Sequence, residues 1–304
     1  MEKILKYVAT HNGSFHADDV FAYVVLRKLF PSYELIRSRN PEILKKAEIL
    51  FDVGGGKYDH HSTDKEYRAN GIPYAAFGLI WRDFGQVFLS KWFDSADIDY
   101  AYQKIDADLV QNIDAFDNGV DTFENPIVEV ETLSTVIAGF NNRVPEVFED
   151  DGSGGYNFEM EWFLRTCDVA ESVLINHIYG IRKLLSMKET VLKAFEKRRS
   201  PEVLILDAHG AWEEWVRTLD EKKEILFVVH PKNEEYHIQV MRKEKNSFEA
   251  RKDLPASWAG KRDDALNQVT GIHDAIFCHP ARFLAIAKSK ESILKMAELA
   301  LQTK

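Results

Sequence analysis

The sequence lacks the features of secreted, disulfide-bonded and membrane-spanning proteins. Only two of its 304 residues are cysteines, Cys167 and Cys278, which are too few for a disulfide framework and indicate a reducing compartment. No apolar run is long enough to span a bilayer, and residues 1–6 resemble neither a signal peptide nor a transit sequence. We therefore expect a cytoplasmic protein that does not bind membranes.

An excess of basic residues is also absent. The chain has 39 lysines and arginines against 49 acidic residues, which gives a formal net charge of −10. This balance excludes a protein that coats nucleic acid by bulk electrostatic attraction, so any such binding would need a local basic surface or bound cations. The sequence contains no internal repeat and no low-complexity tract, and its 45% hydrophobic and 29% charged residues are ordinary for a globular protein.

Residues 1 to about 145 alternate strand-like and helix-like segments. Pro41 opens a short helix, because proline is favoured at the first helical position. Strands that alternate with helices indicate βαβ units, so the sequence predicts an α/β domain with a doubly wound parallel sheet. The other expected segments are strands over 4–9, 33–38 and 49–53 and helices over 20–30, 75–84 and 100–110.

The remaining chain has a different pattern. Residues 149–155 are acidic and glycine-rich and predict a loop, and apolar residues three and four apart predict a long helix over 159–199. We assign residues 151–200 to this linker and connecting helix, whose basic end, Lys197-Arg198-Arg199, complements the helix dipole. Residues 201–304 are predicted to form a smaller α+β domain, with strands over 203–206, 225–229 and 236–240 and a helix over 292–301.

Three clusters of histidine and aspartate lie at predicted strand ends or turns. Asp52 ends a strand, three glycines turn the chain, and Asp59, His60 and His61 follow. Glycines there let the backbone approach a ligand closely, and ligand sites in open α/β sheets lie outside the carboxyl ends of the strands. Residues 10–19 contain a similar cluster, and residues 113–119 add two aspartates before a glycine. Carboxylate and imidazole ligands together suit Mn²⁺, Zn²⁺ or Fe²⁺, so the clusters predict a metal site.

The order of these clusters resembles the DHH phosphoesterase superfamily, most closely its branch of the melanocyte-proliferating-gene exonuclease and its bacterial relatives. The resemblance covers nearly the whole chain. His16 departs from the wider superfamily, where an aspartate usually stands at this place, which leaves the metal preference open. The segments that carry the resemblance are residues 10–19, 71–81, 113–119, 254–260 and 271–279.

The resemblance implies a DHH-type catalytic domain in residues 1–150, a C-terminal substrate-binding domain and two divalent metal ions, Mn²⁺ or alternatively Mg²⁺. It also implies that Asp52 bridges the two ions. The first ion would bind His11, His16 and Asp52, and the second would bind Asp18, Asp52, His60 and one late aspartate, for which Asp117 is favoured over Asp114.

Several neighbours of these residues have expected supporting roles. His61 is not expected to be a metal ligand, because adjacent side chains on an extended segment point in opposite directions. It could instead contact phosphate or orient the late aspartate. Asp59 is expected to orient an imidazole or to cap the turn, and Asp19 is expected to assist the start of a helix.

Three further residues are candidates for substrate contact. Arg68 could hold a phosphate by a two-pronged contact, although a solvated charge is the favoured interpretation. His279 and Arg282 follow a predicted strand over 275–278 and form a candidate anion pocket. An equally weighted interpretation is a turn in which His279 caps the backbone and Arg282 is solvated.

Together with the resemblance, these residues predict a metal-dependent phosphoesterase, a 3′-to-5′ exonuclease on RNA or short oligonucleotides with a two-metal mechanism. Asp52, His60 and His61 are its expected catalytic residues, and the substrate would lie between the two domains. Two alternatives stay open. One is a phosphatase for pyrophosphate or a small nucleotide, which the net acidity favours, and the other is a non-catalytic metal-binding scaffold. An oligomer is possible.

Overall fold

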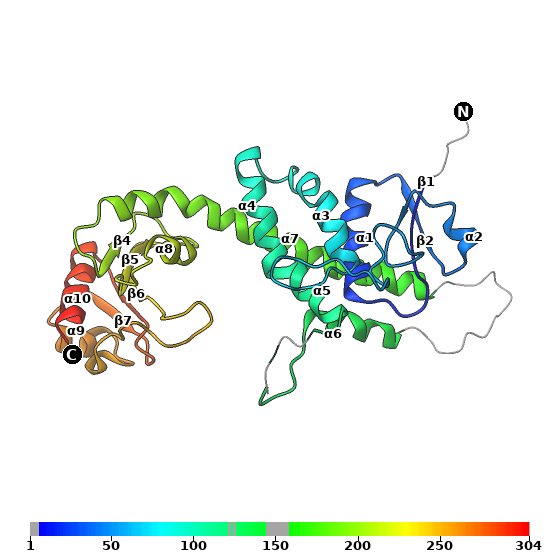
Figure 1. The fold of residues 1–304 in the computed structure, drawn as a ribbon. Coiled ribbons are helices and arrows are strands. Elements are labelled where there is room, and N and C mark those ends of the chain that lie inside the picture. The colour runs from blue at the N-terminus through cyan, green and yellow to red at the C-terminus, as the bar shows by residue number, and fades with distance from the viewer. Residues whose placement is uncertain (1–5, 121–122, 124–125, 144–157, 304) are drawn as a thin grey trace. The chain divides into compact units, whose positions relative to one another are not determined.

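The computed structural model describes residues 6–120, 123, 126–143 and 158–303 (Figure 1). The chain divides into two compact units, Met1–Ile181 and Arg182–Lys304, each with its own sheet. The break falls inside the long helix α7 (Phe158–Glu196). The predicted loop over 149–155, and with it the predicted boundary at 150, lies outside the described residues. Within the described part of the chain, no helix is both long and apolar enough to cross a membrane.

The sheet of the first unit is parallel, as the sequence predicts. Its three strands are β1 (Lys6–Thr10), β2 (Tyr33–Arg37) and β3 (Ile49–Leu50), in the order β2-β1-β3. The chain leaves β1 for β2 on one side and returns to β3 on the other, so β1 is the point at which the strand order reverses. In open parallel sheets, such a switch point opens a crevice at the carboxyl ends of the strands. A helix layer on each face, which a doubly wound domain requires, stays a prediction.

Helix α1 (Ala17–Leu29) connects β1 to β2 and is built by clear local signals. Asp18 and Asp19 lie in its first turn and Arg27 and Lys28 in its last, so the charges complement the helix dipole. Pro31 follows its end. The short α2 (Pro41–Leu44) begins with proline, and the Asn40 side chain accepts a hydrogen bond from Glu42 N.

Helix α1 packs against α3, α5 and α6, and α3 also packs against α5. The predicted helix over 100–110 is in fact two segments, because an α-helix changes there into a π-helical stretch. The remaining helices of this unit are α3 (Ala76–Leu89), α4 (Ser95–Ile105), the π-helix η1 (Asp106–Val110), α5 (Gln111–Asp117), α6 (Leu133–Gly139) and the 3₁₀ helix η2 (Phe140–Arg143).

The second unit contains a five-stranded mixed sheet of order β4-β5-β6-β8-β7. Strands β4 and β5 are parallel, and the other neighbouring pairs are antiparallel. Apolar residues of the strands and of α10 form one buried core, which includes Phe227, Ile238 and Met296. The elements are β4 (Val203–Ile205), α8 (Glu213–Leu219), β5 (Phe227–Lys232), β6 (Glu235–Val240), the 3₁₀ helix η3 (Ala256–Trp258), α9 (Asp263–Thr270), β7 (Ala275–Cys278), β8 (Leu284–Ala287) and α10 (Lys290–Gln302).

Candidate metal centre

The site lies where β1 and β3 end side by side. His11 follows β1, and Asp52 comes two residues after β3. His16 is the N-cap residue of α1, so Asp18 is carried by the first turn of that helix. The third predicted cluster differs from the expectation, because residues 113–117 belong to helix α5 and not to a strand end or a turn. The helix end nevertheless brings Asp117 to the same place.

Asp52 lies at the middle of the cluster, and its two carboxylate oxygens contact different imidazoles. Oδ2 of Asp52 lies 3.0 Å from Nε2 of His11, and Oδ1 lies 3.1 Å from Nε2 of His60. The backbone of Asp52 has φ 55°, a left-handed conformation that few non-glycine residues adopt. The residue is also buried, with 2% of its surface exposed.

Other carboxylates converge on the same two imidazoles. Nε2 of His60 lies 3.1 Å from Oδ2 of Asp117 and 3.5 Å from Oδ2 of Asp18, and Nε2 of His11 lies 3.5 Å from Oδ2 of Asp19. Among the described residues, three sets of side chains have ligand atoms within 4.8 Å of one another: His11, His16 and Asp52; Asp52, His60 and His61; and His16, Asp18 and Asp117. The structure therefore brings six of the seven predicted metal ligands together and leaves out Asp114.

Buried polar atoms at this place fit a cation. Among the described residues, Asp18 Oδ1, Asp19 Oδ2, Asp52 Oδ1 and both ring nitrogens of His60 are buried without a partner in hydrogen-bond geometry. Buried polar groups are rarely left in this state without an ion, a water or a functional reason. A divalent cation coordinated by carboxylate oxygens and imidazole nitrogens would satisfy them, so the donor set fits a metal of the manganese, iron or zinc type.

Burial and the mutual charges of the cluster shift the pKa values of its members. Burial raises the pKa of Asp18 well above its usual value, and the neighbouring charges of Asp52 and Asp117 raise it further. Burial also raises the pKa of Asp19, to about 7, although His11 opposes this. The pKa of Asp52 falls despite its burial, because His11 and His60 stabilise its charge. In turn, Asp52 raises the pKa of both imidazoles against their burial. Without a cation, the cluster therefore retains protons that a metal would displace.

The turn after β3 positions the two adjacent histidines. Asp59 accepts hydrogen bonds from Gly55 N at 2.6 Å and from His61 N at 3.1 Å, and it contacts His61 Nδ1 at 2.8 Å. It thus caps the turn and orients an imidazole, as expected. The expectation that His60 and His61 point in opposite directions is wrong, because their ring centroids lie 4.4 Å apart. His60 is buried, whereas 62% of the His61 side chain is exposed.

Asp19 and the loop after β1 hold the first cluster in place. Asp19 Oδ1 accepts a hydrogen bond from His16 N at 2.9 Å, which agrees with its expected role at the start of the helix. Its contact with His11 was not expected. Arg37 at the end of β2 donates to Gly13 O and pairs with Glu159 of α7, whose carboxylate also accepts from Gly13 N. The loop is therefore fixed by residues far away in the sequence.

Asp114 and Arg68 form a buried ion pair with each other and do not take the predicted roles of metal ligand and phosphate contact. Arg68 Nη2 lies 2.8 Å from Asp114 Oδ2 and 3.0 Å from Asp106 Oδ1, and all of these contacts are buried or largely buried. Asp114 also accepts from Gly78 N at 3.0 Å, which ties α5 to α3. Neither the predicted phosphate contact nor the solvated charge describes Arg68, since buried carboxylates already bind its guanidinium. A Cβ at Gly78 would lie 1.8 Å from Asp114 Oδ2, so this pair requires glycine there.

A pocket of about 450 Å³ opens onto the cluster. Sequence reasoning missed Lys65, whose ammonium group lies 2.7 Å from Asn118 Oδ1, and Phe116, which is 42% exposed. Their only sequence signal is that each lies within a few residues of a predicted ligand. The lining residues are His16, Ala17, Asp52, His60, His61, Lys65, Phe116, Asp117, Asn118, Ser134 and Ala138.

The candidate anion pocket at the end of β7 is not built as predicted. His279 Nδ1 accepts a hydrogen bond from Ala281 N at 3.0 Å, so it caps the turn. Arg282 adopts φ 59°, and its guanidinium lies 2.6 Å from Asp253 Oδ2. The carboxylate already neutralises the guanidinium, which leaves little attraction for an anion. His279 therefore fits the interpretation of this segment as an ordinary turn. Arg282 is paired with the Asp253 carboxylate and is not simply solvated.

Comparison with known proteins gives matches over nearly the whole chain. The family described as "Uncharacterised protein family (UPF0160)", MYG1_exonuc, matches residues 7–301. Human MYG1 exonuclease is 31% identical over 97% of this chain and 85% of its own length, and mouse MYG1 exonuclease is 30% identical over 97% and 84%. The MYG1 protein of Dictyostelium discoideum is 29% identical over 95% and 94%. A solved structure of a pGpG-specific phosphodiesterase, PggH from Vibrio cholerae, aligns over 97% of both chains with 12% identity and a TM-score of 0.29, too low to support a conclusion.

Proposed function

The chain belongs to the uncharacterised protein family UPF0160, the family of the MYG1 exonucleases, and on this basis we propose that it is a metal-dependent phosphoesterase. Its proposed reaction is the 3′-to-5′ hydrolysis of RNA or short oligonucleotides. The observation that carries the proposal is the position of Asp52, whose two oxygens face different imidazoles within a buried set of acids. A carboxylate in this position can serve two cations at once.

Two divalent ions fit the available donors. His11, His16 and Asp52 would hold the first, and Asp18, Asp52, His60 and Asp117 would hold the second. Asp117 is preferred over Asp114 because it contacts His60, while Asp114 is occupied by Arg68. Bound at this place, such a pair of ions supplies an activated water nucleophile and neutralises charge on the phosphoryl oxygens.

The protein's own residues would bind the substrate and handle its protons. His61 is exposed at the pocket, and Asp59 fixes the position of its ring. It is thus placed to donate a hydrogen bond to a phosphoryl oxygen or a proton to the leaving-group oxygen, which departs as a hydroxyl. Lys65 adds a positive charge to the lining, and Phe116 adds an apolar ring against which a base could pack.

A panel of substrates tests this proposal. Purified protein with Mn²⁺ should shorten 5′-labelled RNA progressively, whereas 3′-labelled RNA should release labelled mononucleotide from the outset. Pyrophosphate in the same panel tests the alternative of a small-molecule phosphatase, which the net charge of −10 favours. Asp52→Asn is the control for contaminating nuclease. Cleavage that does not depend on added metal, or that Asp52→Asn retains, would contradict the proposal.

A further inference from the structure

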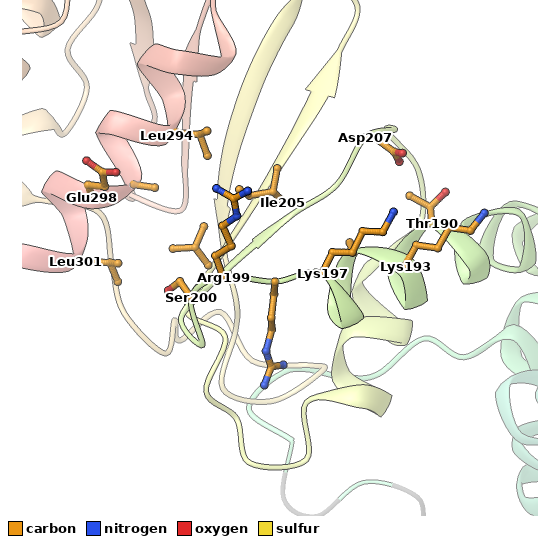
Figure 2. Close-up of a pocket in the computed structure, with 14 residues that line it drawn as sticks. Thr190, Lys193, Lys197, Arg199, Ser200, Ile205, Asp207, Leu294, Glu298 and Leu301 are labelled. Carbon is orange, nitrogen blue, oxygen red and sulfur yellow. The ribbon is translucent and has the colours of Figure 1, made fainter.

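The second unit contains a pocket of about 530 Å³ that the proposed function does not use (Figure 2). It lies among the end of α7, the segment that follows it, strand β4 and helix α10. Strand β4 is at the edge of the sheet, and α10 contacts β5, β6 and β8. The lining residues are Thr190, Lys193, Ala194, Lys197, Arg198, Arg199, Ser200, Val203, Ile205, Asp207, Leu294, Ala297, Glu298 and Leu301.

Cations outnumber acids in this pocket. Four of its residues are lysine or arginine and two are Asp207 and Glu298, so the lining carries two net positive charges. This local balance is opposite in sign to that of the whole chain, which is −10. In the described part of the chain, neither Lys197 nor Arg199 has an ion-pair partner. An anion would therefore find cationic groups that no acid already neutralises.

The helix dipole accounts for these basic residues only in part. Helix α7 ends at Glu196, so Lys197, Arg198 and Arg199 follow the helix and do not form its last turn. Arg198 lies 3.4 Å from Glu224 and stacks on Phe195, yet its Nη1 is buried without a hydrogen-bond partner among the described residues. The assignment of this triplet to the dipole alone is thus incomplete.

The other lining residues indicate which chemical groups the ligand carries besides its anionic group. Figure 2 shows Arg199 directed toward Ile205 of β4 and Leu294 of α10, and all three residues line the pocket. The pocket therefore combines a planar guanidinium with aliphatic side chains. A flat ring can stack on such a guanidinium or pack against the aliphatic wall. Asp207 and Glu298 can accept hydrogen bonds from hydroxyl or amino groups. A simple alkyl phosphate offers neither a flat ring nor such donors, and inorganic phosphate is too small to reach these groups together.

We propose that this pocket binds a nucleoside monophosphate. Lys197 and Arg199 bind its phosphate, the aliphatic wall of Ile205 and Leu294 packs against its base, and a carboxylate accepts a hydrogen bond from its sugar or base. The pocket volume lies within the range of about 300–1,000 Å³ that is usual for small-ligand sites. The ligand class is also the product of the proposed exonuclease reaction, but the binding itself does not rest on that reaction.

Calorimetric titration of the full-length chain with AMP in EDTA tests the proposal. EDTA removes metal ions, so the acidic cluster of the first unit has no cation with which to attract phosphate. We expect one saturable site per chain, with adenosine, inorganic phosphate and octyl phosphate each binding at least about tenfold more weakly. Tighter binding of octyl phosphate, or equal binding of inorganic phosphate, would overturn the assignment to a nucleoside phosphate.

Variants at exposed positions separate this pocket from other sites. Arg199→Ala and Lys197→Ala should each weaken AMP binding about tenfold or more, because each removes a charged contact. Lys183→Ala, on the same helix but outside the lining, should change it less than about twofold. Asp52→Asn should bind AMP as the wild type does, whether or not the chain is a nuclease. No detectable AMP binding, or equal binding by an Arg199→Ala/Lys197→Ala double variant, would overturn the proposal.

Discussion

Nε2 of His60 lies 3.1 Å from Oδ1 of Asp52. The other oxygen of the same carboxylate lies 3.0 Å from Nε2 of His11. Each imidazole therefore has its own oxygen, and the carboxylate joins two halves of one cluster. Loss of its charge should affect both halves, while loss of either imidazole should affect mainly one.

Asp52→Asn tests this joint role. An amide offers one good ligand oxygen in place of two, so we expect manganese content to fall from about two ions per chain to less than one, with loss of hydrolysis. Elemental analysis after saturation and desalting measures the content. The exposed Asp64→Asn is the matched control and should retain both ions. Two ions in Asp52→Asn would show that the carboxylate does not bridge.

His60 and His61 should have separable effects. His60 is buried among Asp18, Asp52 and Asp117, so His60→Ala should remove about one metal ion and abolish activity. His61 is largely exposed, so His61→Ala should keep its metal content and its circular dichroism spectrum but hydrolyse phosphodiesters at least about tenfold more slowly. Metal loss in His61→Ala equal to that in His60→Ala would assign His61 to the ligands instead.

Gly78→Ala should destabilise the first unit. The new methyl group would lie 1.8 Å from Asp114 Oδ2 and 2.8 Å from Arg68 Nη2, so the buried ion pair must move. We expect the free energy of unfolding to fall by about 2 kcal/mol or more in urea denaturation. Gly180→Ala is the control, because this glycine is exposed on α7 and a Cβ added to it would meet no neighbouring atom within 4 Å. That change should be neutral or stabilise by about 0.5–1 kcal/mol.

The metal-free protein should lose stability as the pH rises, and Asp19 should contribute to this loss. Burial raises the pKa of Asp19 from 3.8 to about 7 in the folded chain. The stability associated with its proton is complete below about 3.8 and is lost as the pH rises through about 7. Asn cannot titrate, and its oxygen can still accept the hydrogen bond from His16 N. Asp19→Asn should therefore reduce the slope of stability against pH by about 1.4 kcal/mol per unit in this interval.

Urea denaturation in EDTA between pH 5 and pH 7 gives these slopes. The exposed Asp64→Asn is the control and should run parallel to the wild type. If Asp19→Asn also runs parallel to the wild type, the carboxyl of Asp19 is ionised in the folded protein and its raised pKa is wrong.

Local patterns explain why much of the site was predictable. His11 and Asp52 follow short apolar strands, and the strand alternation with helices places those ends at one edge of a parallel sheet. The sequence favours Asp117 over Asp114 but does not decide between them, because residues three apart on a helix share one face. Only the packing of α5 against α3 turns Asp114 to Arg68 and leaves Asp117 to His60.

Contacts between segments far apart in the sequence also depend on tertiary packing and were therefore not predictable. The buried pairing of Arg68 with Asp106 and Asp114 depends on how η1, α3 and α5 pack, and a loop arginine gives no local sign of it. Strand β8 was also missed, because a short apolar run such as Leu284–Ala287 does not distinguish a strand from other buried segments without its partners β6 and β7.

The left-handed backbone at Asp52 costs stability at a position where the proposed function requires a carboxylate. Glycine would relieve a backbone cost of about 1–2 kcal/mol there, and asparagine tolerates the same conformation, although either change gives up a carboxylate whose charge His11 and His60 stabilise. A library of this chain selected only for resistance to heat should therefore accept glycine or asparagine at position 52 beside aspartate. Selection for phosphodiester hydrolysis should restore aspartate, so the two screens should disagree most clearly at this residue.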